Sequence, residues 1–109
     1  MFTVLVCDDD AAILESLRIY LSQEGYRVLC ARDGLEALEQ VQGEEIHCMV
    51  LDIMMPRLDG LKTTLKLREK YNFPIILLSA KSEDTDKILG LNIGADDYVT
   101  KPFNPVEVL

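Results

Sequence analysis

The sequence lacks the residue patterns of thiol and imidazole chemistry. His47 is its one histidine, and its three cysteines, Cys7, Cys30 and Cys48, have no CxxC spacing. Zinc sites and dithiol redox sites depend on such spacings, so both classes are disfavoured. The cysteines lie within apolar segments, which predicts buried, reduced thiols in a cytoplasmic protein. His47 has no partner at a useful spacing and is predicted to be a surface residue rather than a catalytic base.

Basic residues and long apolar runs are also scarce. Eleven lysines and arginines face nineteen aspartates and glutamates, which leaves a formal net charge of −8. This charge repels the phosphates of nucleic acids and anionic membrane surfaces, so we expect no direct nucleic acid binding. No run approaches the roughly 20 apolar residues of a membrane span, and we expect no membrane partner.

Apolar residues alternate along the 109-residue chain between helical and strand-like spacing. Helices are predicted over residues 11–24, 33–43, 58–70, 83–93 and from 104 onward. The second is marked by Leu35, Leu38 and Val41, and the third by Leu58, Leu61 and Leu65. Strands are predicted over residues 4–7, 26–31, 46–51, 75–78 and 97–100. This alternation predicts one α/β domain, a parallel sheet with helices on both faces.

Polar residues follow most of these strands at their carboxyl ends. Asp8 and Asp9 follow the first, Asp52 the third, Ser79 the fourth and Lys101 the fifth. The carboxyl ends of parallel strands lie at one edge of the sheet, which is where ligands bind in open α/β sheets. We therefore expect these side chains to converge on one site.

The charge of this edge predicts a divalent cation. Its three aspartates and one lysine sum to −2, and two carboxylates about 4 Å apart repel by about 4 kcal/mol near a protein surface. Oxygen ligands without a nearby histidine or thiolate favour Mg²⁺, or Mn²⁺, over zinc or copper. A cation beside Lys101 and Ser79 could hold a phosphoryl group. The Asp52 carboxylate could then attack it to give an aspartyl phosphate.

Four segments together resemble the receiver domain of bacterial two-component response regulators. They are Asp8-Asp9, residues 52–60 with Asp52, Asp59 and Gly60, the pair Ser79-Ala80, and residues 98–103 with Tyr98, Lys101 and Pro102. Their order and spacing match over almost the whole chain. The resemblance implies a flavodoxin-like fold with five parallel strands in the order 2-1-3-4-5.

The resemblance also implies a role for each matched residue. Asp52 would accept a phosphoryl group from the phosphohistidine of a sensor histidine kinase. The direct Mg²⁺ ligands would be Asp9, Asp52 and the Met54 carbonyl, and Asp8 would bind through water. The phosphoryl oxygens would bind Ser79, the Ala80 amide and Lys101. Such a domain is not a classical enzyme, but it catalyses its own phosphorylation and dephosphorylation.

Signalling in this family would use Ser79, which moves toward the phosphoryl group, and Tyr98, the aromatic switch. The face of helix four, strand five and helix five would then change and form a homodimer in the full protein. Residues 1–109 are expected to be a receiver domain, with most of helix five and a C-terminal output domain absent, because residues 104–109 allow less than two helical turns. The motifs are most similar to regulators with a winged-helix output, which predicts transcriptional control.

Several residues have simpler interpretations than a part in chemistry. Helix caps or turns are predicted at Asp10, Asp33, Asp59, Asp96 and Asp97. The side chains of Met54 and Met55 can be explained as core filling, so the role of Met54 concerns only its carbonyl.

Two other functions stay open. Asp8-Asp9-Asp10 also fits the DxD motif of haloacid dehalogenase-like phosphatases, with Asp8 as nucleophile and Asp10 as acid. Ala12 and the short chain depart from that family. A receiver-like module could also signal by binding alone, without phosphorylation. The complete set of site residues favours the phosphoacceptor.

Overall fold

Strands and helices alternate in the computed structural model of the protein, which describes residues 2–55, 57–79 and 94–100. The strands are β1 (Thr3–Cys7), β2 (Arg27–Ala31), β3 (Cys48–Asp52), β4 (Ile75–Ser79) and β5 (Asp97–Thr100). The described helices are α1 (Ala11–Gln23), α2 (Gly34–Gly43) and α3 (Gly60–Arg68). The bounds of these elements differ from the predicted ones by two residues at most. The helices predicted over 83–93 and from 104 lie outside the described residues.

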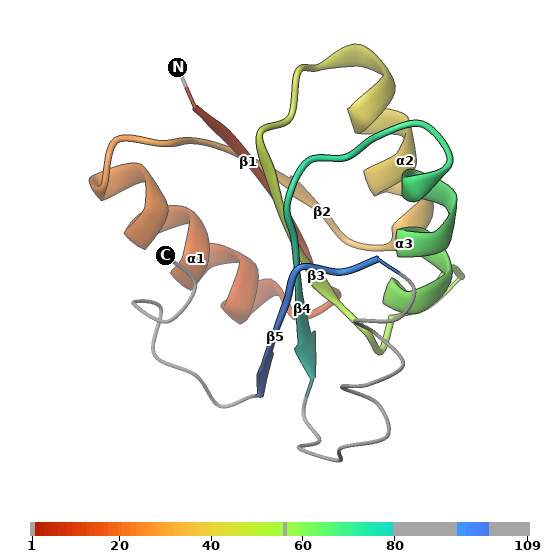
Figure 1. The fold of residues 1–109 in the computed structure, drawn as a ribbon. Helices are drawn as coiled ribbons and strands as arrows, with labels where there is room; N and C mark the ends of the chain where they lie inside the picture. Colours follow the sequence, from red (N-terminus) through yellow and green to blue (C-terminus); the bar gives the residue numbers. More distant parts are fainter. Residues whose placement is uncertain (1, 56, 80–93, 101–109) are drawn as a thin grey trace.

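The strands form one parallel sheet in the order β2-β1-β3-β4-β5. This is the strand order that the resemblance implies. The register pairs Cys7 of β1 with Leu51 of β3, and Asp52 of β3 with Leu78 of β4. Helix α1 covers one face of the sheet, and α2 and α3 lie together over the other face (Figure 1).

Side chains of the central strands alternate between two hydrophobic layers. The layer under α1 contains Val4, Val6, Leu14, Leu17, Leu21, Val50, Leu78 and Val99. The layer under α2 and α3 includes Leu5, Cys7, Met49, Leu51, Leu67, Ile75 and Leu77. Each large aliphatic side chain contributes about 1.5–3 kcal/mol when it is fully buried. Burial on both faces explains why β1, β3 and β4 are almost continuous apolar runs.

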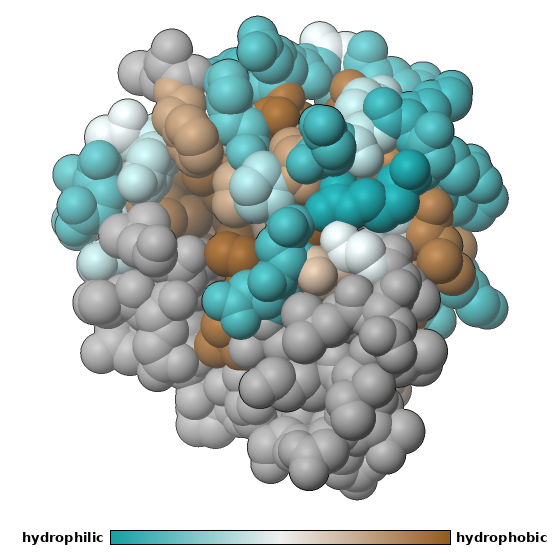
Figure 2. All heavy atoms as spheres, in the orientation of Figure 1, coloured by the Kyte–Doolittle hydropathy of each residue, from teal (hydrophilic) through white to brown (hydrophobic). Residues whose placement is uncertain are grey.

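On the face shown in Figure 2, most of the coloured atoms belong to hydrophilic residues, and hydrophobic residues show in separate patches between them. Within the described ranges, no helix has the length and apolar character needed to cross a membrane.

Aspartate caps the N-terminus of each described helix. The Asp10 side chain accepts hydrogen bonds from the amides of Ala12 and Ile13 at the start of α1. The Asp33 carboxylate accepts from the Glu36 amide in α2, and Asp59 accepts from the Lys62 amide in α3. The predicted caps are therefore confirmed. Each cap satisfies an amide that has no partner within its own helix and places a negative charge at the positive end of the helix dipole.

The buried face of α3 differs from the predicted leucine face. Leu65 is 51% exposed and Leu58 precedes the helix, whereas the buried residues are Gly60, Thr63, Thr64 and Leu67. The two threonines can be buried because their hydroxyls donate to the carbonyls of Asp59 (2.7 Å) and Gly60 (2.8 Å). Small residues are needed on this face, since a Cβ on Gly34 of α2 would lie 2.1 Å from the Thr63 hydroxyl oxygen. In α2 likewise, Leu35 is exposed and Ala37 is buried.

One simpler interpretation needs correction: the Met54 side chain is 66% exposed, so it does not fill the core. His47 is a partly exposed residue, as predicted, and its Nδ1 accepts from the Thr3 amide (2.9 Å) while its ring stacks on Phe2. Asp96 lies exposed in a bend before β5, as predicted. It accepts from the Ile75 amide and pairs with Arg68, both at 2.8 Å, which anchors the approach to β5.

The three cysteines are all free thiols, as predicted, but only Cys7 is fully buried. Burial raises the pKa of Cys48 to about 11 and raises the pKa of Cys7 as well. Both thiols therefore stay protonated at neutral pH.

Gly60 permits a close approach of α3 to β3. A Cβ on Gly60 would lie 2.2 Å from the Asp52 carbonyl oxygen, whereas a Cβ on Gly43 would meet nothing within 4 Å. We expect Gly60→Ala to destabilise the fold by about 2 kcal/mol or more through overpacking. Gly43→Ala, the control, should be neutral or stabilising by up to about 1 kcal/mol. Urea unfolding followed by circular dichroism measures both, and equal midpoints would contradict the contact.

Candidate acidic site at the carboxyl end of the sheet

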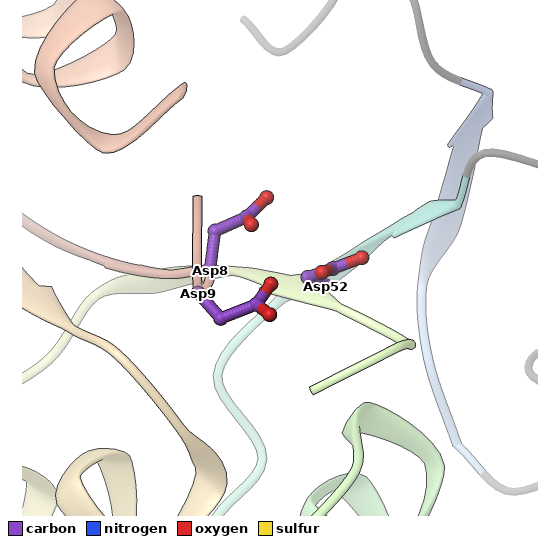
Figure 3. A group of neighbouring side chains, drawn as sticks. All are labelled: Asp8, Asp9 and Asp52. Atoms are coloured by element: carbon purple, nitrogen blue, oxygen red, sulfur yellow. The ribbon is translucent and has the colours of Figure 1, made fainter. Parts of the chain in front are cut away.

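The sheet register brings the predicted carboxylates together. Since Cys7 pairs with Leu51, the next residues, Asp8 and Asp52, lie side by side at the ends of β1 and β3. Asp9 follows in the connection to α1. One ligand atom from each of the three carboxylates lies within 4.8 Å of the others. Figure 3 shows the Asp8 and Asp9 side chains on the side of β1 that faces Asp52.

Two of these carboxylates are buried. Asp8 and Asp52 are almost inaccessible to solvent, whereas Asp9 is exposed. Asp8 is oriented by its Oδ1 atom, which accepts from the Asp10 amide at 2.9 Å. Burial weakens the screening by water, so three neighbouring negative charges repel strongly unless a cation balances them.

The neighbouring thiol of Cys7 lies in the same negative field. Burial is the largest cause of its raised pKa, and the charges of Asp33, Asp8 and Asp52 raise that pKa further. A site with this field and only oxygen ligands suits a hard divalent cation such as Mg²⁺ or Mn²⁺.

Backbone hydrogen bonds hold the chain that follows Asp52. The Ile53 amide donates to the Leu78 carbonyl, and the Gly60 amide donates to the Ile53 carbonyl, both at 2.9 Å. The loop between Ile53 and Gly60 is thus fixed at both ends against β4 and α3. These bonds hold the backbone on the carboxyl side of Asp52.

The other predicted site residues are only partly described. Ser79 ends β4 one residue after Leu78, the partner of Asp52, so its backbone lies at the same edge of the sheet. Tyr98 lies within β5, where its backbone pairs with Leu77. Ala80 and Lys101 lie outside the described residues. The role of the Met54 carbonyl stays a prediction.

An ion pair beside the site was missed by sequence reasoning. The Arg57 guanidinium contacts the Asp33 carboxylate, with Nε donating to Oδ2 at 2.8 Å. The Glu36 amide, followed by Arg57, holds the pKa of Asp33 below its usual range. Asp33 had been assigned only as a cap, because residues so far apart in the chain follow no local pattern.

Comparison with known proteins places the chain among receiver domains. The family model for the response regulator receiver domain matches residues 4–109. The chain is 49% identical over 106 residues to the alkaline phosphatase synthesis transcriptional regulatory protein PhoP of Bacillus subtilis (strain 168). That alignment covers 96% of this chain and 44% of PhoP, so the chain spans less than half the length of this relative.

Two solved structures have the same fold. The receiver domain of the Francisella response regulator 1452 matches with a TM-score of 0.94 and 39% identity, over 99% of this chain and 90% of that one. The BeF3-activated receiver domain of DrrB matches with a TM-score of 0.89 and 37% identity, over 100% of this chain and 92% of that one.

A thermal shift tests cation binding at the acidic site. We expect Mg²⁺ at about 100 times its dissociation constant to stabilise the folded state by about 2.7 kcal/mol. For a domain of this size that raises the melting temperature by about 10 °C. Asp9→Asn and Asp52→Asn should remove most of the shift, because each would delete one of the three neighbouring carboxylates. Asp10→Asn is the matched control, since it makes the same charge change and asparagine still caps the helix. Equal shifts in all three variants would place the cation elsewhere.

Proposed function

The chain belongs to the response regulator receiver family, and from this premise we propose that it is a Mg²⁺-dependent phosphoacceptor whose phosphorylated residue is Asp52. The observation that carries the proposal is the place of Asp52: it ends a central strand, it is 3% exposed, and it lies beside Asp8 and Asp9. Carboxylates that the fold holds together at the end of a sheet against their mutual repulsion are common at functional sites.

In the proposed reaction an Asp52 oxygen attacks the phosphorus of a sensor kinase phosphohistidine. The new P–O bond forms as the P–N bond breaks, and the imidazole leaves with a proton. Asp9, Asp52 and the Met54 carbonyl would bind Mg²⁺ directly, and Asp8 would bind it through water. The ion would neutralise the charge of the phosphoryl oxygens, which the carboxylates otherwise repel.

The remaining proposed roles follow the family motif. Ser79, the Ala80 amide and Lys101 bind the phosphoryl oxygens, and Ser79 and Tyr98 transmit the change. Because the relative PhoP is a transcriptional regulatory protein, we extend the proposal to a transcriptional output, controlled through a homodimer of the face formed by helix four, strand five and helix five. The protein would act in the cytoplasm.

The rival phosphatase assignment requires Asp10 to act as an acid. Its Oδ1 atom instead accepts from the Ala12 amide at 2.9 Å and from the Ile13 amide at 3.4 Å. Asp10 is thus engaged as a helix cap, which favours Asp52 over Asp8 as the nucleophile.

Mapping the acyl phosphate tests the assignment. With Mg²⁺ and acetyl phosphate as donor, we expect one phosphoryl group per chain, and reductive trapping should locate it at Asp52. Asp52→Asn should abolish the label, because an amide cannot form the acyl phosphate. Asp59→Asn should retain it, since Asp59 caps α3 and asparagine can replace it. A label on Asp8 would support the phosphatase chemistry. No response to either acetyl phosphate or beryllofluoride would support a module that signals by binding alone.

A further inference from the structure

Asp33 contacts both β1 and the loop between β3 and α3, and it is not one of the proposed ligands of the acidic site. The residue is 5% exposed. Its Oδ1 atom accepts from the Glu36 amide at 2.9 Å, and its Oδ2 atom accepts from Nε of Arg57 at 2.8 Å and from Nη2 of the same residue. Its carbonyl accepts from the Cys7 thiol at 3.2 Å. Asp33 thus bonds to β1, to its own helix α2 and to the loop before α3.

The contact between the Asp33 carbonyl and the Cys7 thiol leads to Asp8 and Asp9. Cys7, which is fully buried, directly precedes Asp8 in the chain. Its sulfur also lies 3.4 Å from the Met55 sulfur in the loop after β3. The end of β1, the start of α2 and this loop are therefore packed around one thiol, and a displacement of one of them is passed to the others.

The contact between the Asp33 carboxylate and Arg57 leads to the loop that carries Met54. Arg57 has a φ of 65°, in the left-handed region that residues other than glycine seldom adopt. Its neighbour Leu58 accepts from the Gly34 amide at 3.2 Å. Among the described residues of the loop between β3 and α3, only Arg57 forms ion pairs. A strained backbone held by a specific contact is often found where the position of a loop matters for function.

We propose that Arg57 is a positioning residue of the phosphoacceptor site. By bonding to Asp33, it holds the loop with the Met54 carbonyl at a fixed place relative to Asp8 and Asp9, and so sets the affinity for Mg²⁺. This inference rests on the proposed function, in which the Met54 carbonyl is a ligand of the ion. Groups hydrogen-bonded directly to a metal ligand change metal affinity by about 10- to 100-fold when they are lost. Arg57 acts one step further out, through Asp33 and the loop, so we expect an effect at the lower end of that range.

If Arg57 acted only through its charge, its removal would change the affinity for Mg²⁺ in the opposite direction. Without the guanidinium, the Asp33 carboxylate would add an unbalanced negative charge next to the acidic site, which by itself would strengthen the binding of a cation. Loss of loop position would weaken binding. The direction of the change therefore separates positioning from charge.

Calorimetric titration of the whole chain with MgCl₂ tests the proposal. We expect Arg57→Gly to weaken Mg²⁺ binding by about tenfold. Its melting temperature should change little, because glycine relieves the left-handed backbone of strain while the loss of the ion pair with Asp33 removes a stabilising contact. Arg57→Lys should weaken Mg²⁺ binding as well, since lysine keeps the charge but cannot donate through both Nε and Nη2. Arg27→Lys is the matched control, because Arg27 forms a similar forked pair with Glu44 at the amino end of β2.

Two outcomes would overturn the proposal. Wild-type Mg²⁺ affinity in Arg57→Gly, or tighter binding, would show that Arg57 does not position the loop, and the proposed function would still stand. A wild-type chain that binds no Mg²⁺ would refute the proposed function and this inference together. Weaker binding in both Arg57 variants, with an unchanged melting temperature and a normal Arg27→Lys control, would support positioning over a merely structural role.

Discussion

The acidic site depends on the register between β1 and β3. Because Cys7 pairs with Leu51, the residues that follow, Asp8 and Asp52, meet at one edge of the sheet. A slip of one residue would turn one of these side chains to the opposite face. The register is fixed by apolar side chains that fill two layers on either side of the same strands. Hydrophobic packing therefore sets the distances between charges, which would not approach one another unaided.

The aspartates of this acidic chain have two different roles. Asp10, Asp33 and Asp59 each accept a hydrogen bond from a helix amide, so their charges meet the positive ends of helix dipoles. Asp8, Asp9 and Asp52 instead place one carboxylate oxygen each within 4.8 Å of the others. The capping aspartates stabilise the fold, whereas the carboxylates of the cluster repel one another. A net charge alone does not distinguish these uses; position does.

The sequence predicted the parts of this structure that follow a local pattern. Apolar periodicity located the strands, and Asp52 stood out because a charge ends a buried strand. The buried face of α3 was mispredicted, since Thr63 and Thr64 are polar in sequence but satisfy their hydroxyls within the helix. The bond between Arg57 and Asp33 joins residues 24 positions apart, and no spacing rule connects them. Contacts of this kind exist only after the sheet has formed.

The proposed positioning of the loop by Arg57 would also affect how the domain responds to its ligands. Linkage is reciprocal: if the bond between Arg57 and Asp33 strengthens cation binding, then a bound cation strengthens that bond to the same extent. The effect would reach α2 through the Asp33 cap and β1 through the Cys7 thiol, which donates to the Asp33 carbonyl. This route lies on the side of the sheet covered by α2 and α3 and does not include Tyr98. Occupation of the acidic site would therefore stabilise the α2 side of the domain before any phosphoryl group arrives.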